Sequence, residues 1–222
     1  MKKAILGSED RYQAWLRRAG DNYGFARVQN SQSAADYDVF VDLNFDEHPE
    51  RICDYCGNTR TVFLLSSVLC TPEMAMAKAA LKYNGEQFFG INALPGFLER
   101  NILEISNPFS LATDNLIQQY NLPFDDCEWV KSRVGMVTPR IVFMIVNEAF
   151  YTVEEGTALE ADIDTAMKLG TAYPRGPFEW LQLSGINNVY CTLKALHEHT
   201  GDERYRISHL LNSKWYNAQI TL

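Results

Sequence analysis

The sequence has no apolar stretch long enough to cross a membrane and no excess of basic residues. Its longest apolar runs, residues 141–146 and 62–65, fall far short of the roughly 20 residues that a membrane helix needs. Lysine and arginine number 20 against 28 acidic residues, and the net charge of −8 disfavours binding to nucleic-acid backbones. Residues 1–7 hold two lysines and an apolar stretch too short for a signal peptide. We therefore expect a cytoplasmic protein that binds neither membranes nor nucleic acid.

Cysteine and histidine, the usual ligands of metal sites, are also scarce. The five cysteines do not form an even set, and the CxxC pair Cys53 and Cys56 lacks the two further ligands that a zinc site needs. Two of the four histidines, His197 and His199, lie two positions apart and so on different faces of a helix. The sequence contains no Walker loop, GxSxG elbow or HExxH motif. We expect reduced thiols, surface histidines and no metal.

The 222 residues are 46% apolar, which is enough for a substantial core. In the first half, short β-like runs alternate with helical stretches, a rhythm typical of a parallel sheet covered by helices. Only residues 29–35 separate the second strand from the third, too few for a complete crossover. The α/β part therefore looks trimmed. Strands are expected at 3–6, 23–28, 38–43, 61–65, 88–91 and 102–105, and helices at 9–18, 49–56 and 73–82.

The second half changes to an all-helical pattern. Between residues 138 and 155, apolar side chains recur at spacings of one, three and four and form one stripe along a helix. Further helices are expected at 160–169 and 187–200, with a short helical finish at 208–211. Glycines at 156, 170 and 201 are plausible helix ends. The predicted fold class is α/β plus all-α, with domains 1–134 and 135–222.

Residues 135–211 carry motifs that resemble the C-terminal domain of the 3-hydroxyacyl-CoA dehydrogenase family, of the 3-hydroxybutyryl-CoA dehydrogenase kind. The most specific part is the run 162–170 followed by Gly176-Pro177-Phe178-Glu179. Residues 37–41, 61–67, 89–92 and 103–105 resemble the Rossmann part of the same family more weakly. The resemblance implies a trimmed Rossmann-like sheet followed by a helical dimerisation domain. It also implies a homodimer, an acyl-CoA ligand and NAD as cofactor.

The cofactor site departs from the family pattern. A Rossmann fingerprint needs three glycines beside the pyrophosphate, whereas the first strand here is followed by Gly7 alone, then Ser8, Glu9 and Asp10. Two carboxylates beside a pyrophosphate repel it and fill its space. Gly7 is therefore a weak candidate for cofactor binding, and an ordinary turn glycine is the preferred interpretation. We expect that NAD is not bound in the usual way.

The catalytic dyad departs from the pattern as well. The family takes the proton of the substrate hydroxyl with a histidine that a glutamate orients, and these positions match Asn92 and Glu104. The amide of Asn92 cannot take up a proton, and a conserved asparagine of the family falls on Pro139. The substrate-contacting serine matches Ser67, with Ser66 equally possible. Glu104 is then a leftover charge or an alternative base.

Three functions follow from these residues. The first is a degenerate family member that keeps the fold and the dimer, has lost hydride chemistry, and binds an acyl-CoA or a partner protein. The second is an active NAD-dependent 3-hydroxyacyl-CoA dehydrogenase with a rebuilt site, in which Glu104 is the base. The third is a structural or regulatory dimer without a small-molecule ligand. The losses at Asn92, Pro139 and the glycine loop favour the first.

Overall fold

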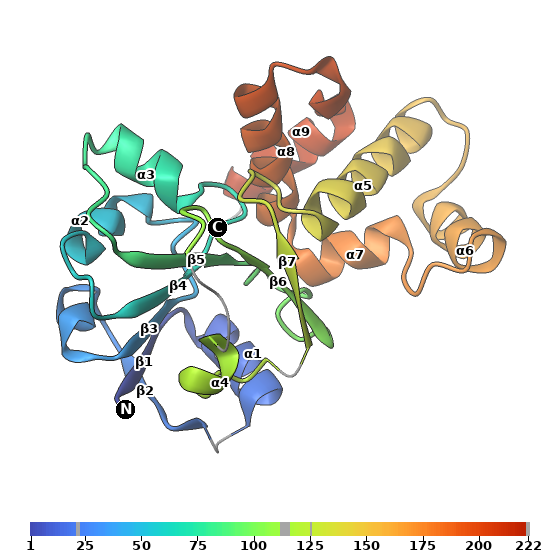
Figure 1. The fold of residues 1–222 in the computed structure, drawn as a ribbon. Helices are drawn as coiled ribbons and strands as arrows, with labels where there is room; N and C mark the ends of the chain where they lie inside the picture. Colours follow the sequence, from blue (N-terminus) through green and yellow to red (C-terminus); the bar gives the residue numbers. More distant parts are fainter. Residues whose placement is uncertain (21–22, 112–115, 125, 221–222) are drawn as a thin grey trace. The chain divides into compact units, whose positions relative to one another are not determined.

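The computed structural model describes residues 1–20, 23–111, 116–124 and 126–220 (Figure 1). The chain divides into two compact units, Met1–Met136 and Val137–Leu222. The first holds a sheet with helices on both of its faces, and the second is built from helices. This is the α/β plus all-α class that the sequence predicts.

The first unit is built on a seven-stranded sheet of order β2-β1-β3-β4-β5-β6-β7. β1 pairs in parallel with both β2 and β3, and β3, β4 and β5 continue the parallel set. The register aligns the ends of these strands, so their carboxyl ends meet along one edge. The strands are β1 (Lys3–Leu6), β2 (Phe25–Val28), β3 (Val39–Asp42), β4 (Val62–Ser66), β5 (Gln87–Ile91), β6 (Ile102–Ser106) and β7 (Asp126–Val130).

The connection from β2 to β3 is trimmed, as the short segment 29–35 predicts. The chain passes over β1 with a single 3-10 helix, η2 (Gln32–Asp36), in place of a full crossover helix. β1 therefore connects to β2 on one side, while the chain returns to β3 on its other side. This reversal is the topological switch point of the sheet, where ligands of open α/β sheets bind.

Alternate strand residues face opposite sides of the sheet and form two separate cores. On one face, α1 (Glu9–Ala19) and α4 (Leu116–Gln119) pack with residues such as Ile5, Val41 and Leu64. On the other face, η2, α2 (Ile52–Tyr55) and α3 (Pro72–Lys78) pack with residues such as Phe40 and Phe63. The short 3-10 helix η3 (Pro49–Arg51) leads into α2. The central strands β1, β3 and β4 are buried on both faces, which is why they are nearly continuous apolar runs.

Two strands correct the expectation of a wholly parallel sheet. β6 runs antiparallel to β5, with Gly90 opposite Ser106 and Ile91 opposite Ile105. β7, which the sequence reading missed, pairs in parallel with β6 at the edge. Two predicted segments also shift. The second strand begins at Phe25, and α3 ends at Lys78 because Ala80 adopts a positive φ of 53°.

The second unit contains the predicted helices and two that the sequence reading left short or unassigned. α8 ends at Gly201, whose φ of 65° is left-handed, as expected for a C-terminal glycine. The final helix α9 runs well past the predicted residues 208–211. The helices of the second unit are α5 (Thr138–Glu154), α6 (Glu160–Gly170), α7 (Pro177–Ser184), α8 (Ile186–Thr200), η4 (Glu203–Tyr205) and α9 (His209–Ile220). Within the described ranges, no helix has the length and apolar character needed to cross a bilayer.

Candidate functional site

Asn92 and Glu104 lie opposite each other on neighbouring antiparallel segments. Asn92 directly follows β5, Glu104 lies in β6, and the Asn92 backbone N–H donates to the Glu104 carbonyl oxygen at 3.3 Å. The Asn92 side chain is 2% exposed and that of Glu104 is 8% exposed. The Leu94 N–H donates to Asn92 Oδ1 at 3.4 Å. The structure thus brings together the two residues that the sequence matched to the catalytic dyad.

Ser67 lies beside this pair at the end of β4. Its backbone N–H donates to the Ile91 carbonyl at 3.1 Å, while its hydroxyl is buried and has no hydrogen-bond partner among the described residues. A Cβ added to Gly90 would lie 2.0 Å from the Ser67 Oγ and 2.4 Å from the Ser106 Oγ. The two hydroxyls therefore occupy the space that a side chain at position 90 would fill. Asn92, Glu104, Ser67 and Ser106 form one polar cluster, named here the dyad cluster.

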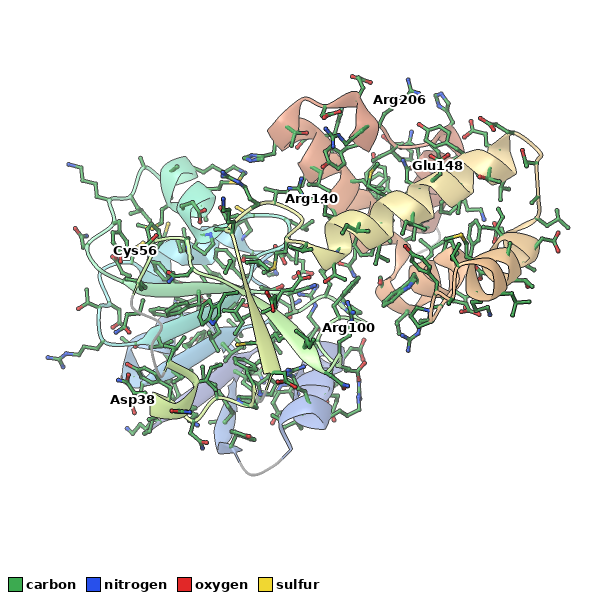
Figure 2. All side chains as sticks on the ribbon, turned by 45° about the vertical axis from the view of Figure 1, so that its right-hand side comes forward. Asp38, Cys56, Arg100, Arg140, Glu148 and Arg206 are labelled. Carbon is green, nitrogen blue, oxygen red and sulfur yellow. The ribbon has the colours of Figure 1, made fainter. Side chains whose placement is uncertain are left out.

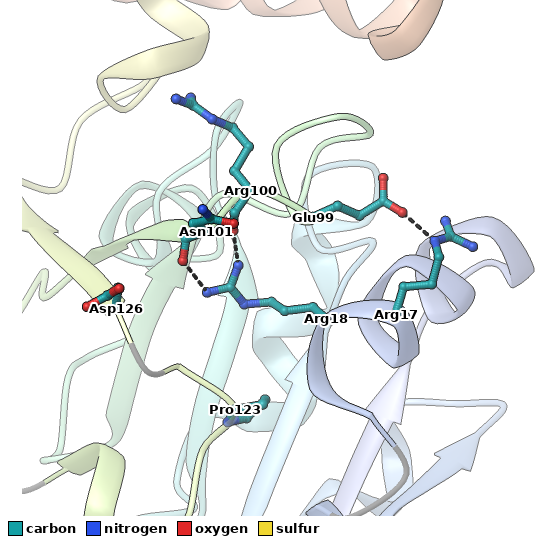
Figure 3. Close-up of a pocket in the computed structure, with 7 residues that line it drawn as sticks. All are labelled: Arg17, Arg18, Glu99, Arg100, Asn101, Pro123 and Asp126. Carbon is teal, nitrogen blue, oxygen red and sulfur yellow. Dashed lines mark hydrogen bonds and ion pairs between the residues drawn. The ribbon is translucent and has the colours of Figure 1, made fainter.

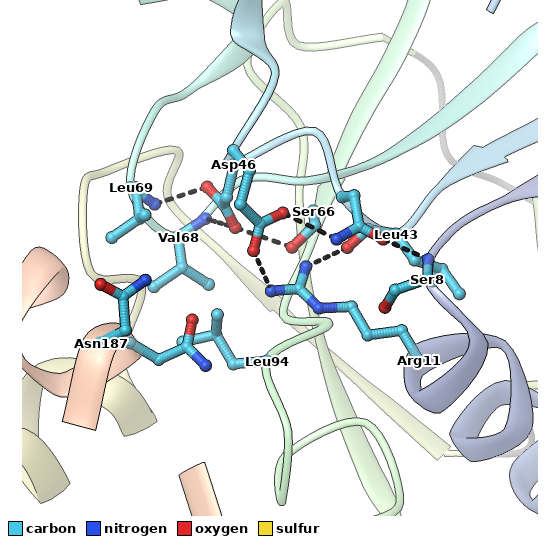
Figure 4. A network of polar contacts seen from close by, with 12 residues as sticks. Ser8, Arg11, Leu43, Asp46, Ser66, Val68, Leu69, Leu94 and Asn187 are labelled. Atoms are coloured by element: carbon cyan, nitrogen blue, oxygen red, sulfur yellow. Dashed lines mark hydrogen bonds and ion pairs between the residues drawn. The ribbon is translucent and has the colours of Figure 1, made fainter. Parts of the chain in front are cut away.

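Ser66, the alternative to Ser67, makes a different set of contacts. Its hydroxyl donates to Asp46 Oδ2 at 2.7 Å (Figure 4). The same carboxylate accepts from the backbone N–H groups of Val68 (3.1 Å), Leu69 (2.6 Å) and Cys70 (3.3 Å). Burial raises the pKa of Asp46 to about 6, and these hydrogen bonds oppose the rise. Asp46 therefore holds the loop that follows β4.

Gly7 and Ser8 pack directly against the end of β3. A Cβ on Gly7 would lie 3.1 Å from Leu43 Cβ, so the glycine permits close contact between these two strand ends. The Ser8 N–H donates to Asn44 Oδ1 at 2.6 Å. Gly7 thus has a packing role, and its assignment to cofactor binding stays a prediction.

A polar pocket of about 360 Å³ lies in the same unit (Figure 3). The Arg18 guanidinium donates to the carbonyl oxygens of Leu98 and Asn101, each at 3.2 Å, and to that of Arg100. Arg17 pairs with Glu99. Arg18 thereby fixes the loop that leads into β6, the strand that carries Glu104. The pocket is lined by Arg17, Arg18, Glu99, Arg100, Asn101, Pro123 and Asp126.

Pro139 belongs to the second unit, where it is buried in the first turn of α5. Proline suits this position because the first turn needs no backbone donor. The next residue, Arg140, lies near the start of the same helix (Figure 2) and donates to the Tyr205 hydroxyl at 2.8 Å. Among the residues that the structure describes, no group of three or more His, Cys, Asp or Glu side chains is placed to hold a metal.

Comparison with known proteins identifies the helical unit. A family model, the 3-hydroxyacyl-CoA dehydrogenase C-terminal domain, matches residues 135–219. The C-terminal part of this chain is therefore similar to that domain. The 3-hydroxyadipyl-CoA dehydrogenase of Escherichia coli K12 is 45% identical over 80 residues, which are 36% of this chain and 17% of that protein. The matched part of the chain thus spans well under two thirds of this relative.

Two solved structures resemble the whole chain. The (S)-3-hydroxybutyryl-CoA dehydrogenase PaaH1 from Ralstonia eutropha has a TM-score of 0.70 at 15% identity. FadB2 of M. tuberculosis has a TM-score of 0.74 at 14% identity. Each comparison covers 98% of this chain and 94% of the other. At these identities the likeness concerns the fold alone, and the first unit thereby has a Rossmann-like fold.

The acidic motif of the 3-hydroxyacyl-CoA dehydrogenase C-terminal domain has a structural cause here. Asp164 of α6 accepts from the backbone N–H groups of Phe178 at 2.8 Å and Glu179 at 3.2 Å, which begin α7. Glu179 in turn accepts from the Gly176 N–H at 2.9 Å and pairs with Lys168. A Cβ on Gly176 would lie 2.2 Å from Asp164 Oδ1, so only glycine fits. The motif therefore locks α6 to the start of α7.

Sequence reasoning missed four contributors to the site region, namely Ser106, Arg11, Asn44 and Asp46. Arg11 is 6% exposed and reaches from α1 to the Leu43 carbonyl and the Glu47 carboxylate. The available signal was positional, since Asn44, Asp46 and Glu47 directly follow a predicted parallel strand. Polar residues there lie at the edge where ligands of such sheets bind.

Proposed function

We propose that this chain is a catalytically degenerate, 3-hydroxyacyl-CoA dehydrogenase-like protein that binds an acyl-CoA without oxidising it. The observation that carries the proposal is Asn92, which lies opposite Glu104 where the resemblance implies a histidine. An imidazole accepts a proton near neutral pH, and a carboxamide does not. General base catalysis contributes typically 10²–10⁴-fold, so its loss alone would reduce turnover by about that factor.

The first unit offers no substitute imidazole close to Glu104. His48 is the single histidine of residues 1–136 in the sequence. It lies on the loop after β3, with its side chain 48% exposed and its Nδ1 3.2 Å from Glu50 Oε1. A proton released from a substrate hydroxyl at the dyad cluster would therefore have Glu104 as its acceptor, without an imidazole supplied by this unit.

The retained ligand contact is assigned to Ser67 rather than Ser66. The Ser66 hydroxyl already donates to Asp46. Ser67 is 1% exposed, and its hydroxyl has no hydrogen-bond partner among the described residues. A buried unsatisfied hydroxyl is unfavourable by roughly 1–3 kcal/mol, and a ligand oxygen at Ser67 would relieve this. The thioester or 3-oxo oxygen of an acyl-CoA has the required acceptor chemistry. Asn92 would supply a second neutral hydrogen-bonding group.

The same proposal includes the loss of normal NAD binding and the retention of a homodimer. The loop after β1 has one glycine where the fingerprint needs three, and Glu9 in the first turn of α1 pairs with Arg27. Pro139 adds a further loss, since it has no side-chain amide. The homodimer rests on the family resemblance of the second unit and on its exposed apolar residues.

The proposal is tested by separating binding from turnover. Acetoacetyl-CoA is expected to raise the melting temperature of the purified protein by mass action, and more than free CoA does. NADH formation from 3-hydroxybutyryl-CoA is expected to stay at background. Measurable NADH formation would instead favour the second function, an active dehydrogenase.

Substitutions separate the assigned contact from general effects on stability. Ser67→Ala should reduce the melting shift caused by acetoacetyl-CoA, while Ser33→Ala, on η2, should leave that shift unchanged. If neither the wild-type protein nor the variants respond to any acyl-CoA, the ligand part of the proposal is wrong. The structural-dimer function would then be the remaining one of the three.

A further inference from the structure

Three arginine–carboxylate pairs lie along the carboxyl ends of the first three strands. Arg27 of β2 pairs with Glu9 at the start of α1, and Arg51 of η3 pairs with the buried Asp42 of β3 at 3.1 Å. Arg11 of α1 pairs with Glu47, which follows β3. In a Rossmann-like unit this edge receives a dinucleotide. Here internal charge pairs join the elements that would otherwise flank such a ligand.

Several hydrogen bonds join the two sides of the switch point between β1 and β3. Arg11 is almost fully buried and donates to both the Leu43 carbonyl and the Glu47 carboxylate (Figure 4). Asn44 accepts from the Ser8 N–H at 2.6 Å and donates to Glu47 Oε2 at 3.0 Å. These five residues, Ser8, Arg11, Leu43, Asn44 and Glu47, are named here the β1–β3 bridge. It links the end of β1 and the start of α1 to the residues that follow β3.

The β1–β3 bridge does not fit a bound pyrophosphate. The Ser8 N–H, a backbone donor that faces the phosphates in such loops, is already used by Asn44. The Arg11 guanidinium is neutralised by Glu47, so it presents no free positive charge. A pyrophosphate would have to displace these hydrogen bonds and come to lie beside the carboxylates of Glu9 and Glu47. The residues at the switch point therefore do not fit the NAD cofactor that the family resemblance implies.

We infer that the β1–β3 bridge is an internal replacement for the dinucleotide, which holds the ends of β1 and β3 together without a cofactor. The inference deepens the proposed function and rests on its claim that NAD is not bound in the usual way. It adds the residues responsible and their role. Arg11 supplies the positive group and Glu47 the anion that a dinucleotide would otherwise provide at this place.

The test measures the melting temperature of the full chain with and without millimolar NAD or inorganic pyrophosphate. The wild-type melting temperature should not respond to either anion. Arg11→Met should lower it by roughly 5–10 °C, because Glu47 and the Leu43 carbonyl lose a buried partner. Arg100→Met is the control, since that side chain is exposed and does not belong to the β1–β3 bridge.

A double-mutant comparison tests the pairing itself. Glu47→Gln should lower the melting temperature less than Arg11→Met, and the double variant should be no less stable than Arg11→Met alone, because the two residues act as one unit. Additive losses, or a wild-type melting temperature for Arg11→Met, would overturn the inference. So would a wild-type protein that NAD or pyrophosphate stabilises.

These outcomes are distinct from failure of the proposed function. A protein that NAD stabilises, yet that binds acetoacetyl-CoA and forms no NADH, would retain the lost-catalysis proposal and overturn the bridge. In the opposite case, neither acyl-CoA nor NAD changes the melting temperature, but Arg11→Met lowers it. That result would support the bridge and overturn the ligand proposal.

Discussion

Gly90 is the residue at which the dyad cluster leaves least room. A methyl group there would overlap the hydroxyls of Ser67 and Ser106, with separations of 2.0 and 2.4 Å. We expect Gly90→Ala to lower the free energy of unfolding by about 1–3 kcal/mol through overpacking. Urea denaturation measures the change, and Gly170→Ala is a control because nothing lies within 4 Å of the added Cβ.

The same collision predicts a rescue. If the two hydroxyls cause the loss, Gly90→Ala should be better tolerated when Ser67 is already alanine. Equal losses in both backgrounds would show that the backbone at position 90, rather than the Ser67 hydroxyl, limits the site.

Asp46 makes the stability of the first unit depend on pH. Its folded pKa of about 6 lies above its usual 3.8, so the folded chain binds the proton more tightly than the unfolded chain. This stabilisation is fully present below about pH 4 and is lost as the pH rises through 6; the difference is on the order of 3 kcal/mol. Unfolding midpoints in urea should therefore rise from pH 7.5 to pH 5. Asp46→Asn should flatten that rise, and Asp36→Asn, at an exposed position, should not.

In Asp46→Asn, part of the pH dependence of the unfolding midpoint should remain. Burial also raises the pKa of Asp42, although hydrogen bonds from Tyr55 and charge on Arg51 oppose the rise. Carboxyls with lowered pKa values act in the opposite direction at more acidic pH. Hydrogen bonds from Gln13 and then Arg27 lower the pKa of Glu9, for example. An unchanged slope in Asp46→Asn would contradict the role given to this residue.

At the scale of the helix, α7 depends on a side chain from α6 for its first turn. Asp164 satisfies the N–H groups of Phe178 and Glu179, which have no partner inside α7. Asp164→Ala should lower the free energy of unfolding by about 1–2 kcal/mol, the usual range for a lost N-terminal cap. Asp162→Ala, an exposed change on the same helix, provides the comparison in urea denaturation. Equal effects of the two substitutions would refute the capping role.

The elements that the sequence predicted are those whose pattern is local. β1 and β4 are short apolar runs buried on both faces, and α5 carries an apolar stripe of helical spacing. β7 was missed because Asp126–Val130 is half exposed and carries two acidic residues, so its place depends on pairing with β6. α9 was cut short because Leu211 is its buried anchor and the turns beyond lack a clear apolar face.

At the scale of the site, the family resemblance matched Asn92 and Glu104 to one dyad, and the two residues do lie opposite each other. The antiparallel pairing that brings them together was not predicted. The β1–β3 bridge joins Arg11 to Glu47 across 36 positions, and no local pattern marks that pairing. Long-range polar contacts depend on where the sheet places its strand ends, which becomes visible only in the folded chain.

For the whole molecule, the second unit presents apolar side chains that a single chain leaves exposed. Leu169 at the end of α6 is 83% exposed and Ile220 at the end of α9 is 82% exposed. Since such surface favours association, we expect sedimentation to give a mass of about twice 25.3 kDa. Leu169→Glu should shift the equilibrium toward monomer, whereas Gln32→Glu, which adds the same charge to the first unit, should not. A monomeric wild-type protein would contradict the homodimer, and a dimer that withstands both Leu169→Glu and Ile220→Glu would place its interface elsewhere.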